Sequence, residues 1–306
     1  MPQIERLVTG WRHLRHWVQG TEAHERTREA LGALLARQVA LQEHPVSLAA
    51  VEFRIHSQFG DDGIIQWLIA RLPGLPKLFV EFGVEDYTEA NTRFLMVNNA
   101  WRGLVMDGSR ENIRRLRNRG WFWRHDLTAI SRFLTRDNVD ESINDWARGR
   151  NVGLMHIDVD GNDYWLWDAV HCITPGIVIM EYNAIFGAER PITIPYQANF
   201  SRFTAHRSGQ YFGASLPALA HLADTKGYAL VGVNSAGNNA YFVRRELLDE
   251  RLRAVDVRDA FVSPQFRESR DDGGRLDYLD FQGRQARIRG MPVVDVITGK
   301  TETFSY

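Results

Sequence analysis

The sequence lacks most of the features that would place a protein outside the cell, in a membrane or on nucleic acid. Its one cysteine, Cys172, cannot form an internal disulfide, which fits a reducing compartment. There is no run of about 18 consecutive apolar residues, and the first residues lack the apolar core of a signal peptide. A formal net charge of −1 creates no global field that would attract nucleic acid or an acidic membrane. These absences predict a cytoplasmic protein with no membrane span and no nucleic-acid partner.

The most informative stretch that is present, residues 78–107, has the wiring of a nucleotide-binding βαβ unit. The apolar run Leu78–Val80 ends in Glu81, Phe82 and Gly83, and a helical stretch follows. A second apolar run then ends in Asp107. The turn glycine allows the backbone to approach a ligand, and the second acid can accept hydrogen bonds from a ribose diol.

Short apolar runs alternate with helical patterns five times along the chain, and a helix and a hairpin follow. This pattern predicts an α/β domain over residues 51–245, with a mostly parallel sheet and helices on both faces. Within it we expect a short strand at 121–123 and a long loop at 187–208. Residues 1–50 predict a helical extension that packs on the domain or on a second subunit, and residues 246–306 predict an appendage.

Acidic residues follow the predicted parallel strands. They are Glu81, Asp107, Asp126, the pair Asp158 and Asp160, and Glu181 with Asn183 close behind it. In an open parallel sheet, ligands bind beyond the carboxyl ends of the strands. Carboxylates are costly to bury without a hydroxyl, an amine or a cation. Each acid alone could be a cap or a surface residue, but the array predicts a ligand-binding edge.

Glycine-rich phosphate-binding loops are missing from this edge. The dinucleotide fingerprint needs three glycines in the pattern G-x-G-x-x-G, and the turn after the first strand supplies only Gly83. A Walker A loop is also missing. The sequence therefore favours a nucleoside ligand without phosphates.

The series of motifs resembles the class I S-adenosylmethionine-dependent methyltransferases. Within that superfamily it is most similar to FkbM-type and macrocin-type sugar O-methyltransferases, because Ile157-Asp158-Val159-Asp160-Gly161 looks like the Ile-Asp-Val-Glu-Gly segment of FkbM-type members. The resemblance covers about residues 52–245 and implies a Rossmann-like, seven-stranded sheet with a terminal antiparallel hairpin. Glu85 and Asp86 stand where relatives usually carry further glycines.

The resemblance implies S-adenosylmethionine as the cofactor. The residues that it assigns to the cofactor site are Glu81, Gly83, Asp107, Ser109, Asp126, Ser57 and Gln58. Asp107 would hold the ribose hydroxyls, and Asp126 would lie near the adenine amine. Ser57 and Gln58 would close the pocket from the N-terminal side.

Methyl transfer to an alcohol also requires removal of the acceptor's proton, by a general base or through a metal ion. His206, in the predicted long loop, is the first candidate for the base, and Asp163 is the second. Lone histidines are more often structural or exposed than catalytic, so a structural role for His206 stays open.

Metal-dependent members of the family place an acid after the fourth strand and an acid with an amide after the fifth. Asp158 or Asp160, with Glu181 and Asn183, could match that pattern. All-oxygen ligands suit Mg²⁺. The alternative is that Asp158 and Asp160 organise the turn through hydrogen bonds to nearby backbone.

The resulting prediction is O-methylation of a sugar or glycoside hydroxyl in polysaccharide or natural-product biosynthesis, with a small-molecule or glycan acceptor. A homo-oligomer formed through the N-terminal helices is compatible with the sequence. Two alternatives stay open. One is a nucleotide-sugar glycosyltransferase that uses the D-x-D of Asp158-Val159-Asp160, and the other is a non-catalytic protein that keeps the methyltransferase fold.

Overall fold

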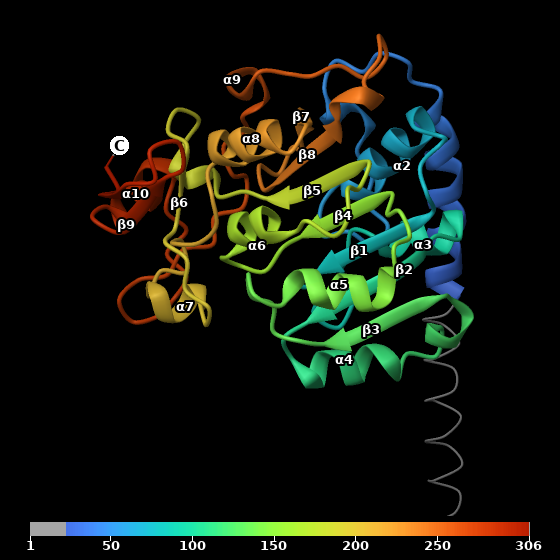
Figure 1. Ribbon diagram of the computed structural model, residues 1–306, viewed down its shortest axis with the longest axis horizontal. Coiled ribbons are helices and arrows are strands. Elements are labelled where there is room, and N and C mark those ends of the chain that lie inside the picture. Colours follow the sequence, from blue (N-terminus) through green and yellow to red (C-terminus); the bar gives the residue numbers. More distant parts are fainter. Residues whose placement is uncertain (1–22, 306) are drawn as a thin grey trace, which may run out of the picture.

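A seven-stranded sheet forms the centre of the computed structural model, which describes residues 23–305 (Figure 1). Its strands are β1 (Leu78–Phe82), β2 (Arg102–Asp107), β3 (Leu127–Ser131), β4 (Leu154–Ile157), β5 (Ile177–Glu181), β7 (Tyr228–Val233) and β8 (Asn239–Arg244). The spatial order is β3-β2-β1-β4-β5-β8-β7. Only β8 runs antiparallel to its neighbours, β5 and β7. The predicted Rossmann-like sheet with a terminal hairpin is confirmed.

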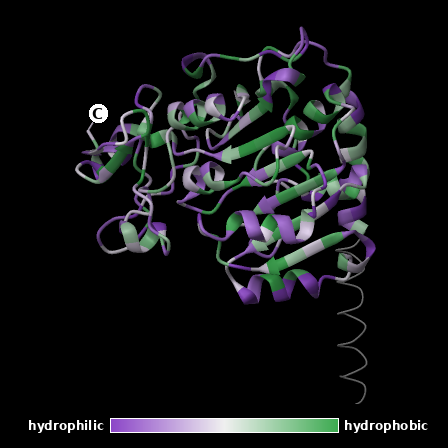
Figure 2. Cartoon of the chain, viewed as in Figure 1, coloured by the Kyte–Doolittle hydropathy of each residue, from purple (hydrophilic) through white to green (hydrophobic). Residues whose placement is uncertain are grey.

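Helices cover both faces of this sheet. They are α2 (Asp61–Arg71), α3 (Arg93–Asn99), α4 (Arg110–Arg117), α5 (Val139–Ala147), α6 (Asp163–Ala169) and α8 (Leu216–Thr225). Helices α5, α6 and α8 share one apolar core with the sheet, whereas α2, α3 and α4 share the other. The strand residues alternate between these cores, since Val80 and Phe82 face the first and Phe79 the second. Apolar strands between more polar helices follow from this arrangement (Figure 2).

A smaller antiparallel sheet lies beyond the carboxyl ends of the central strands (Figure 1). Its strands, in the order β10-β9-β6, are β6 (Ile192–Thr193), β9 (Pro292–Asp295) and β10 (Thr301–Thr303). Two segments of the chain, residues 187–208 and 246–305, form this sheet. They also contain the helices α7 (Arg202–Ala205), α9 (Val257–Ala260) and α10 (Phe281–Ile288). The predicted long loop therefore contains a strand and a helical turn, and it packs with the C-terminal segment around Ile192 and Phe304.

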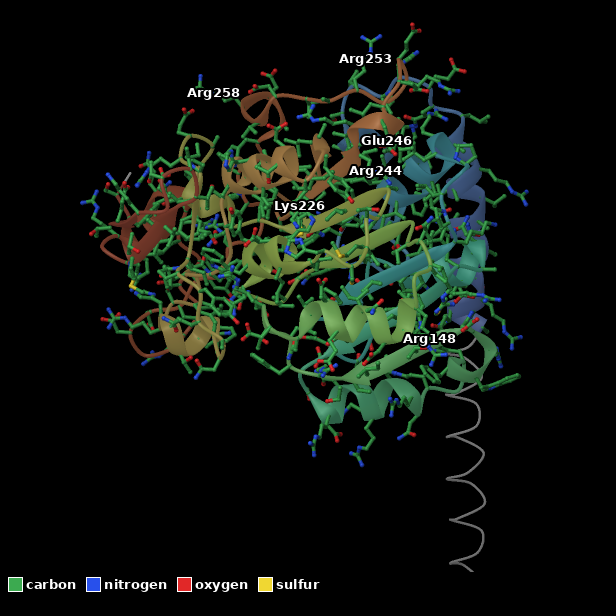
Figure 3. The ribbon with its side chains drawn as sticks, in the orientation of Figure 1. Arg148, Lys226, Arg244, Glu246, Arg253 and Arg258 are labelled. Carbon is green, nitrogen blue, oxygen red and sulfur yellow. The ribbon has the colours of Figure 1, made fainter. Side chains whose placement is uncertain are left out.

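Short 3-10 helices complete the described chain: η1 (Leu48–Val51), η2 (Phe122–Arg124), η3 (Ala184–Phe186) and η4 (Arg245–Leu247). Residues 23–40 are helical, and Ala36 packs against Ile55 and Phe94. The earlier part of the predicted N-terminal helices lies outside the described residues. Among residues 23–305, no helix is both long and apolar enough to cross a membrane. Charged side chains such as Arg253 and Arg258 project from the surface of the C-terminal segment (Figure 3).

The strand predicted at residues 121–123 is wrong, because a 3-10 turn occupies that position. The N–H of Arg124 donates to the carbonyl of Trp121 at 2.9 Å, and the Arg93 guanidinium lies 4.7 Å over the Trp121 ring. The third strand is β3, which begins after Asp126. Asp126 therefore lies at the amino edge of the sheet, where it pairs with Arg102 at 3.1 Å. Its predicted contact with the cofactor adenine is incompatible with this position.

Candidate functional site

A cavity of about 660 Å³ opens at the carboxyl edge of the central sheet. Its walls come from the ends of β1, β2, β4 and β5, from the loop before α2, and from the segments around residues 200–203 and 266–268. The acidic lining residues are Glu81, Glu85, Glu89, Asp107, Asp158, Asp160, Glu181 and Glu268. Within residues 23–305, the basic groups of that lining are Arg132, Arg202 and His156. The cavity is therefore suited to a cationic or donor-rich ligand.

The turn after β1 brings two strand ends into close contact at Gly83. This residue has φ +73°, and a Cβ on it would lie 1.5 Å from the Asp158 carbonyl oxygen. Only glycine fits that space. Glu85, two residues later, also adopts a left-handed backbone, with φ +48°. The loop thus has a glycine-like conformation at Glu85, a position that carries a side chain.

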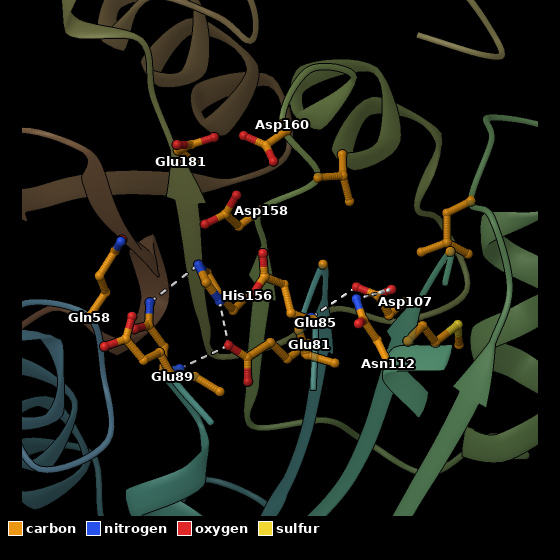
Figure 4. Close-up of a pocket in the computed structure, with 18 of the residues that line it drawn as sticks. Gln58, Glu81, Glu85, Glu89, Asp107, Asn112, His156, Asp158, Asp160 and Glu181 are labelled. Atoms are coloured by element: carbon orange, nitrogen blue, oxygen red, sulfur yellow. Dashed lines mark hydrogen bonds and ion pairs between the residues drawn. The ribbon is translucent and has the colours of Figure 1, made fainter. Parts of the chain in front are cut away.

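Asp107 ends β2 and faces the cavity in a fixed orientation (Figure 4). Its Oδ2 accepts the N–H of Glu85 at 2.8 Å, and its Oδ1 accepts the N–H of Ser109 at 2.7 Å and the Nδ2 of Asn112 at 3.3 Å. The Ser109 hydroxyl accepts the N–H of Asn112 and so caps α4. Ser109 thus supports Asp107 from outside the cavity lining, which corrects its predicted role as a cofactor contact.

Glu81 and His156 form a buried ion pair beneath the cavity. They are register partners on β1 and β4, and the Nδ1 of His156 lies 2.8 Å from Oε1 of Glu81. The carboxylate also accepts the backbone N–H groups of Asn91 at 2.9 Å and Thr92 at 3.1 Å, as well as the Thr92 hydroxyl. These bonds fix the start of α3. Glu81 lies at the predicted position, but its oxygens already have protein donors.

The ion pair shifts both pKa values toward the charged forms. Burial alone would raise the pKa of Glu81, but the hydrogen bond and charge of His156 hold it below the ordinary value. Burial alone would lower the pKa of His156, but the bond and charge of Glu81 raise it instead. His156 did not stand out in the sequence, where its signal was a single polar residue inside an otherwise apolar strand.

Three carboxyl groups gather beside this pair, at the ends of β4 and β5. Asp158, Asp163 and Glu181 can each place an oxygen within 4.8 Å of the others. Oε2 of Glu181 is buried and has no hydrogen-bond partner among residues 23–305. Burial and the neighbouring acids raise the pKa of Glu181 well above its ordinary value and that of Asp158 to about 7. A divalent cation would relieve this repulsion.

Two residues predicted as metal ligands lie outside this group. Asp160 has φ +56° and forms an ion pair with Arg202, so its carboxylate already has a cationic partner although it lines the cavity close to Glu181 (Figure 4). The Asn183 side chain donates to the carbonyls of Gln210 and Phe212 at 2.9 and 3.0 Å. The oxygen of that amide accepts the N–H of Ile185. The prediction of Asn183 as a ligand is therefore wrong.

Neither predicted general base lies in the cavity lining. Asp163 accepts the backbone N–H groups of Val159 at 2.7 Å and Gly161 at 2.9 Å, so it organises the turn before α6. Asp163 thus has the turn-forming role that the sequence offers as an alternative for Asp158 and Asp160. His206 lies beside Ser208, with its Nδ1 2.7 Å from the hydroxyl, and burial and Arg207 lower its pKa. The structure gives both side chains other partners, and a role as general base for either stays a prediction.

Two residues of the loop before α2 have different positions relative to the cavity. Ser57 is buried, and its hydroxyl donates to the carbonyl of Phe59 at 2.8 Å and contacts Asp62 at 2.9 Å. It braces the loop and does not line the cavity, which corrects its predicted contact with the cofactor. Gln58 does line the cavity (Figure 4), and its contact with a cofactor stays a prediction.

Comparisons with known proteins give likenesses of structure alone. No family model matches the chain, and no curated protein does. An O-methyltransferase from Bacillus cereus in complex with SAH (S-adenosylhomocysteine) is 15% identical over 71% of this chain and 91% of that chain, with a TM-score of 0.38. An S-adenosylmethionine-dependent methyltransferase from Clostridium acetobutylicum is 10% identical over 60% and 90%, with a TM-score of 0.39. The N-terminal domain of EvdMO1 with SAH bound is 10% identical over 60% and 79%, with a TM-score of 0.38.

These similar structures are all methyltransferases, but the identities are low and every TM-score is below 0.5. The function proposed below therefore rests on the chain's own topology and cavity. The closer likeness to FkbM-type and macrocin-type enzymes stays a prediction.

Proposed function

We propose that the protein is an S-adenosylmethionine-dependent methyltransferase that acts on a hydroxyl of a sugar or glycoside. The observation that carries this proposal is the placement of Asp107 beside the Gly83 turn, at the carboxyl edge of a Rossmann-like sheet. An acid at the end of β2 can accept the two hydroxyls of a ribose. No glycine-rich phosphate loop accompanies it in the sequence.

The charge of the cavity supports a cationic cofactor. S-adenosylmethionine carries a sulfonium and an ammonium group, and eight acids line the cavity against two arginines and one histidine. The close approach of Gly83 to Asp158 leaves backbone, and no side chain, between the ends of β1 and β4. The methionine part of the cofactor would lie over this turn, and the ribose would lie at Asp107.

The acceptor hydroxyl would then lie near the ends of β4 and β5, behind the methyl group. Transfer is an in-line displacement in which the acceptor oxygen bonds to the methyl carbon as the carbon–sulfur bond breaks, so positioning is the main catalytic task. The hydroxyl proton must also leave. Asp158 and Glu181 are the carboxyl groups at that position, and both have raised pKa values caused by burial and by neighbouring acids.

The same residues fit a divalent cation. Asp158, Asp163 and Glu181 would hold Mg²⁺, since all three offer oxygen ligands and one of the Glu181 oxygens is buried without a partner within the described chain. When bound, such an ion would lower the pKa of a nearby hydroxyl. Thermal unfolding with and without Mg²⁺ tests this part without an acceptor. The ion should stabilise the wild type and the variant Asp160→Asn, but not Glu181→Gln.

The glycosyltransferase alternative finds less support in the geometry. A D-x-D motif would need both Asp158 and Asp160 to hold a metal ion against a diphosphate, and Asp160 is paired with Arg202. Calorimetry with the full-length protein tests the choice. We expect micromolar binding of SAH and none of UDP with Mn²⁺. Binding of UDP or GDP alone would support a glycosyltransferase, and no binding of either class would support a non-catalytic protein.

A further inference from the structure

Buried oxygen atoms without donors lie on the side of the cavity formed by β5 and β8. Glu181 and Asn239 both line the cavity, and their exposed fractions are 7% and 4%. Neither Oε2 of Glu181 nor Oδ1 of Asn239 has a hydrogen-bond partner in the part of the chain that the structure describes. The two residues are directly paired across the antiparallel strands, so their side chains are neighbours.

A buried network fixes the orientation of the Asn239 amide. Its Nδ2 donates to Oδ1 of Asp61 at 2.9 Å. The same oxygen accepts Nδ2 of Asn234 at 3.1 Å and the hydroxyl of Tyr241. Asp61 is fully buried, and a carboxylate can only accept hydrogen bonds. The amino group of the Asn239 amide must therefore face Asp61, which leaves the carbonyl oxygen as the atom without a partner on a residue that lines the cavity.

Burying the Oδ1 atom of Asn239 without a hydrogen-bond donor costs free energy as long as no ligand is bound. A buried acceptor that finds no donor loses the hydrogen bond that it makes with water in the unfolded chain. A bound group with an O–H or N–H bond would remove that cost. A group that can only accept hydrogen bonds would meet the oxygen with a lone pair and would be rejected.

The C-terminal segment adds an aromatic surface to the same cavity. The ring of Phe266 stacks on that of Phe59, with 5.9 Å between centroids and 20° between planes. Arg284, which is 2% exposed, holds the backbone in place by donating to the carbonyls of Phe266 at 2.8 Å and Pro264 at 3.1 Å. A ligand with an apolar face and polar edges fits such a combination, and a saccharide ring has both.

We propose that Asn239 determines acceptor specificity by accepting, through Oδ1, a hydrogen bond from an O–H or N–H group of a saccharide ring that lies beside Phe266. Asp61 is the positioning residue that keeps the amide in the required orientation. Calling this saccharide the methyl acceptor rests on the methyltransferase activity proposed above. The hydrogen-bond preference itself does not.

Saturation-transfer NMR on the full-length protein, in the presence of SAH, tests the proposal with three probes. They are methyl glucoside, glucosamine, and a fully O-methylated glucose that has no donor. We expect the wild type to bind at least one of the first two about tenfold more tightly than the third, because the third leaves the buried oxygen of Asn239 without a donor. If methyl glucoside and glucosamine bind with equal affinity, the donor is a hydroxyl group. If glucosamine binds more tightly, the donor is its ammonium group.

The variant Asn239→Leu should lose this preference, since its side chain cannot accept a hydrogen bond. The variant Asp61→Asn tests the orientation without changing Asn239. An asparagine at that position can donate, so the Asn239 amide can rotate and present its amino group. The preference should then shift toward the O-methylated probe. A merely structural role of Asp61 would lower stability without reversing the preference.

Three outcomes would overturn the proposal. They are equal binding of the O-methylated probe to the wild type, an unchanged preference in Asn239→Leu, and no binding of any probe. Arg258→Gln, on the outer surface, is the control that should behave as the wild type (Figure 3). SAH affinity is measured separately on each sample. A wild type that binds sugars with this preference but fails to bind SAH would contradict the methyltransferase activity and leave the role of Asn239 intact.

Discussion

Replacing His156 with glutamine removes the imidazole partner of the buried Glu81 carboxylate. Truncating one member of a buried ion pair costs about 3–5 kcal/mol, because the other charge stays buried without compensation. Glu81 keeps the two backbone N–H groups of Asn91 and Thr92 and the hydroxyl of Thr92, so the loss should fall near the lower limit, about 3 kcal/mol. Exposed pairs such as Arg258 with Glu189 should contribute at most about 1 kcal/mol.

Urea unfolding followed by tryptophan fluorescence measures both losses at pH 6. Arg258→Gln provides the matched exposed control, since its side chain is 73% exposed. A midpoint for His156→Gln as close to the wild type as that of the control would refute the buried pair. The transition slope must stay unchanged for the midpoints to be compared.

The double variant Glu81→Gln, His156→Gln gives the pH dependence of the pair. The lowered pKa of Glu81 means that its stabilisation is present above about 4.5 and is lost as pH falls through the folded value. The raised pKa of His156 means that its stabilisation is complete below about 6.5 and is lost as pH rises through the folded value. The stability difference between wild type and double variant should therefore be greatest between pH 4.5 and 6.5 and decline on both sides. A difference that grows steadily with pH would contradict this assignment.

Three further predictions concern the turn and the acidic cluster. Gly83→Ala should abolish SAH binding and lower the unfolding midpoint, because the new Cβ overlaps the Asp158 carbonyl. If calorimetry showed that this variant binds SAH with wild-type affinity, the result would contradict the contact. Glu85→Gly should raise stability by about 1 kcal/mol in urea unfolding, because it relieves a left-handed backbone; a loss of stability would show that the strain is absent. Mn²⁺ affinity, measured by electron paramagnetic resonance, should fall below pH 7. Burial and acidic neighbours raise the pKa of Asp158 to about 7, so a proton competes with the ion below that pH. An affinity independent of pH would exclude Asp158 as a ligand.

The sheet could be predicted because its strands are short apolar runs, each bounded by turn residues or acids. The failure at residues 121–123 has a physical cause. An aromatic run has high strand propensity, but tertiary contacts such as the stacking of Arg93 on Trp121 favour a turn there. Because the third strand begins after Asp126 and does not end before it, Asp126 lies at the amino edge of the sheet and not at the predicted carboxyl edge.

The gathering of acids at the carboxyl edge of the sheet could be predicted, but the contacts of each acid could not. Asp158 and Asp163 of the segment 158–163 join Glu181 across a turn with a left-handed backbone at Asp160, and single-sequence patterns do not reveal such a conformation. His156 pairs with Glu81, 75 positions earlier in the chain, and that separation has no local signal. No local signal in the sequence indicates that the C-terminal segment reaches the cavity and contributes Phe266 to its lining.

SAH affinity compared between Asp107→Asn and Asp126→Asn tests the central proposal most directly. Both variants remove one carboxylate at a strand end, but Asp107 faces the cavity and Asp126 lies at the opposite edge of the sheet. We predict that Asp107→Asn weakens SAH binding about tenfold or more, because a charge-assisted hydrogen bond to the ribose is lost, and that Asp126→Asn leaves it unchanged. Equal affinity in both variants, at the wild-type value, would contradict a cofactor site at Asp107.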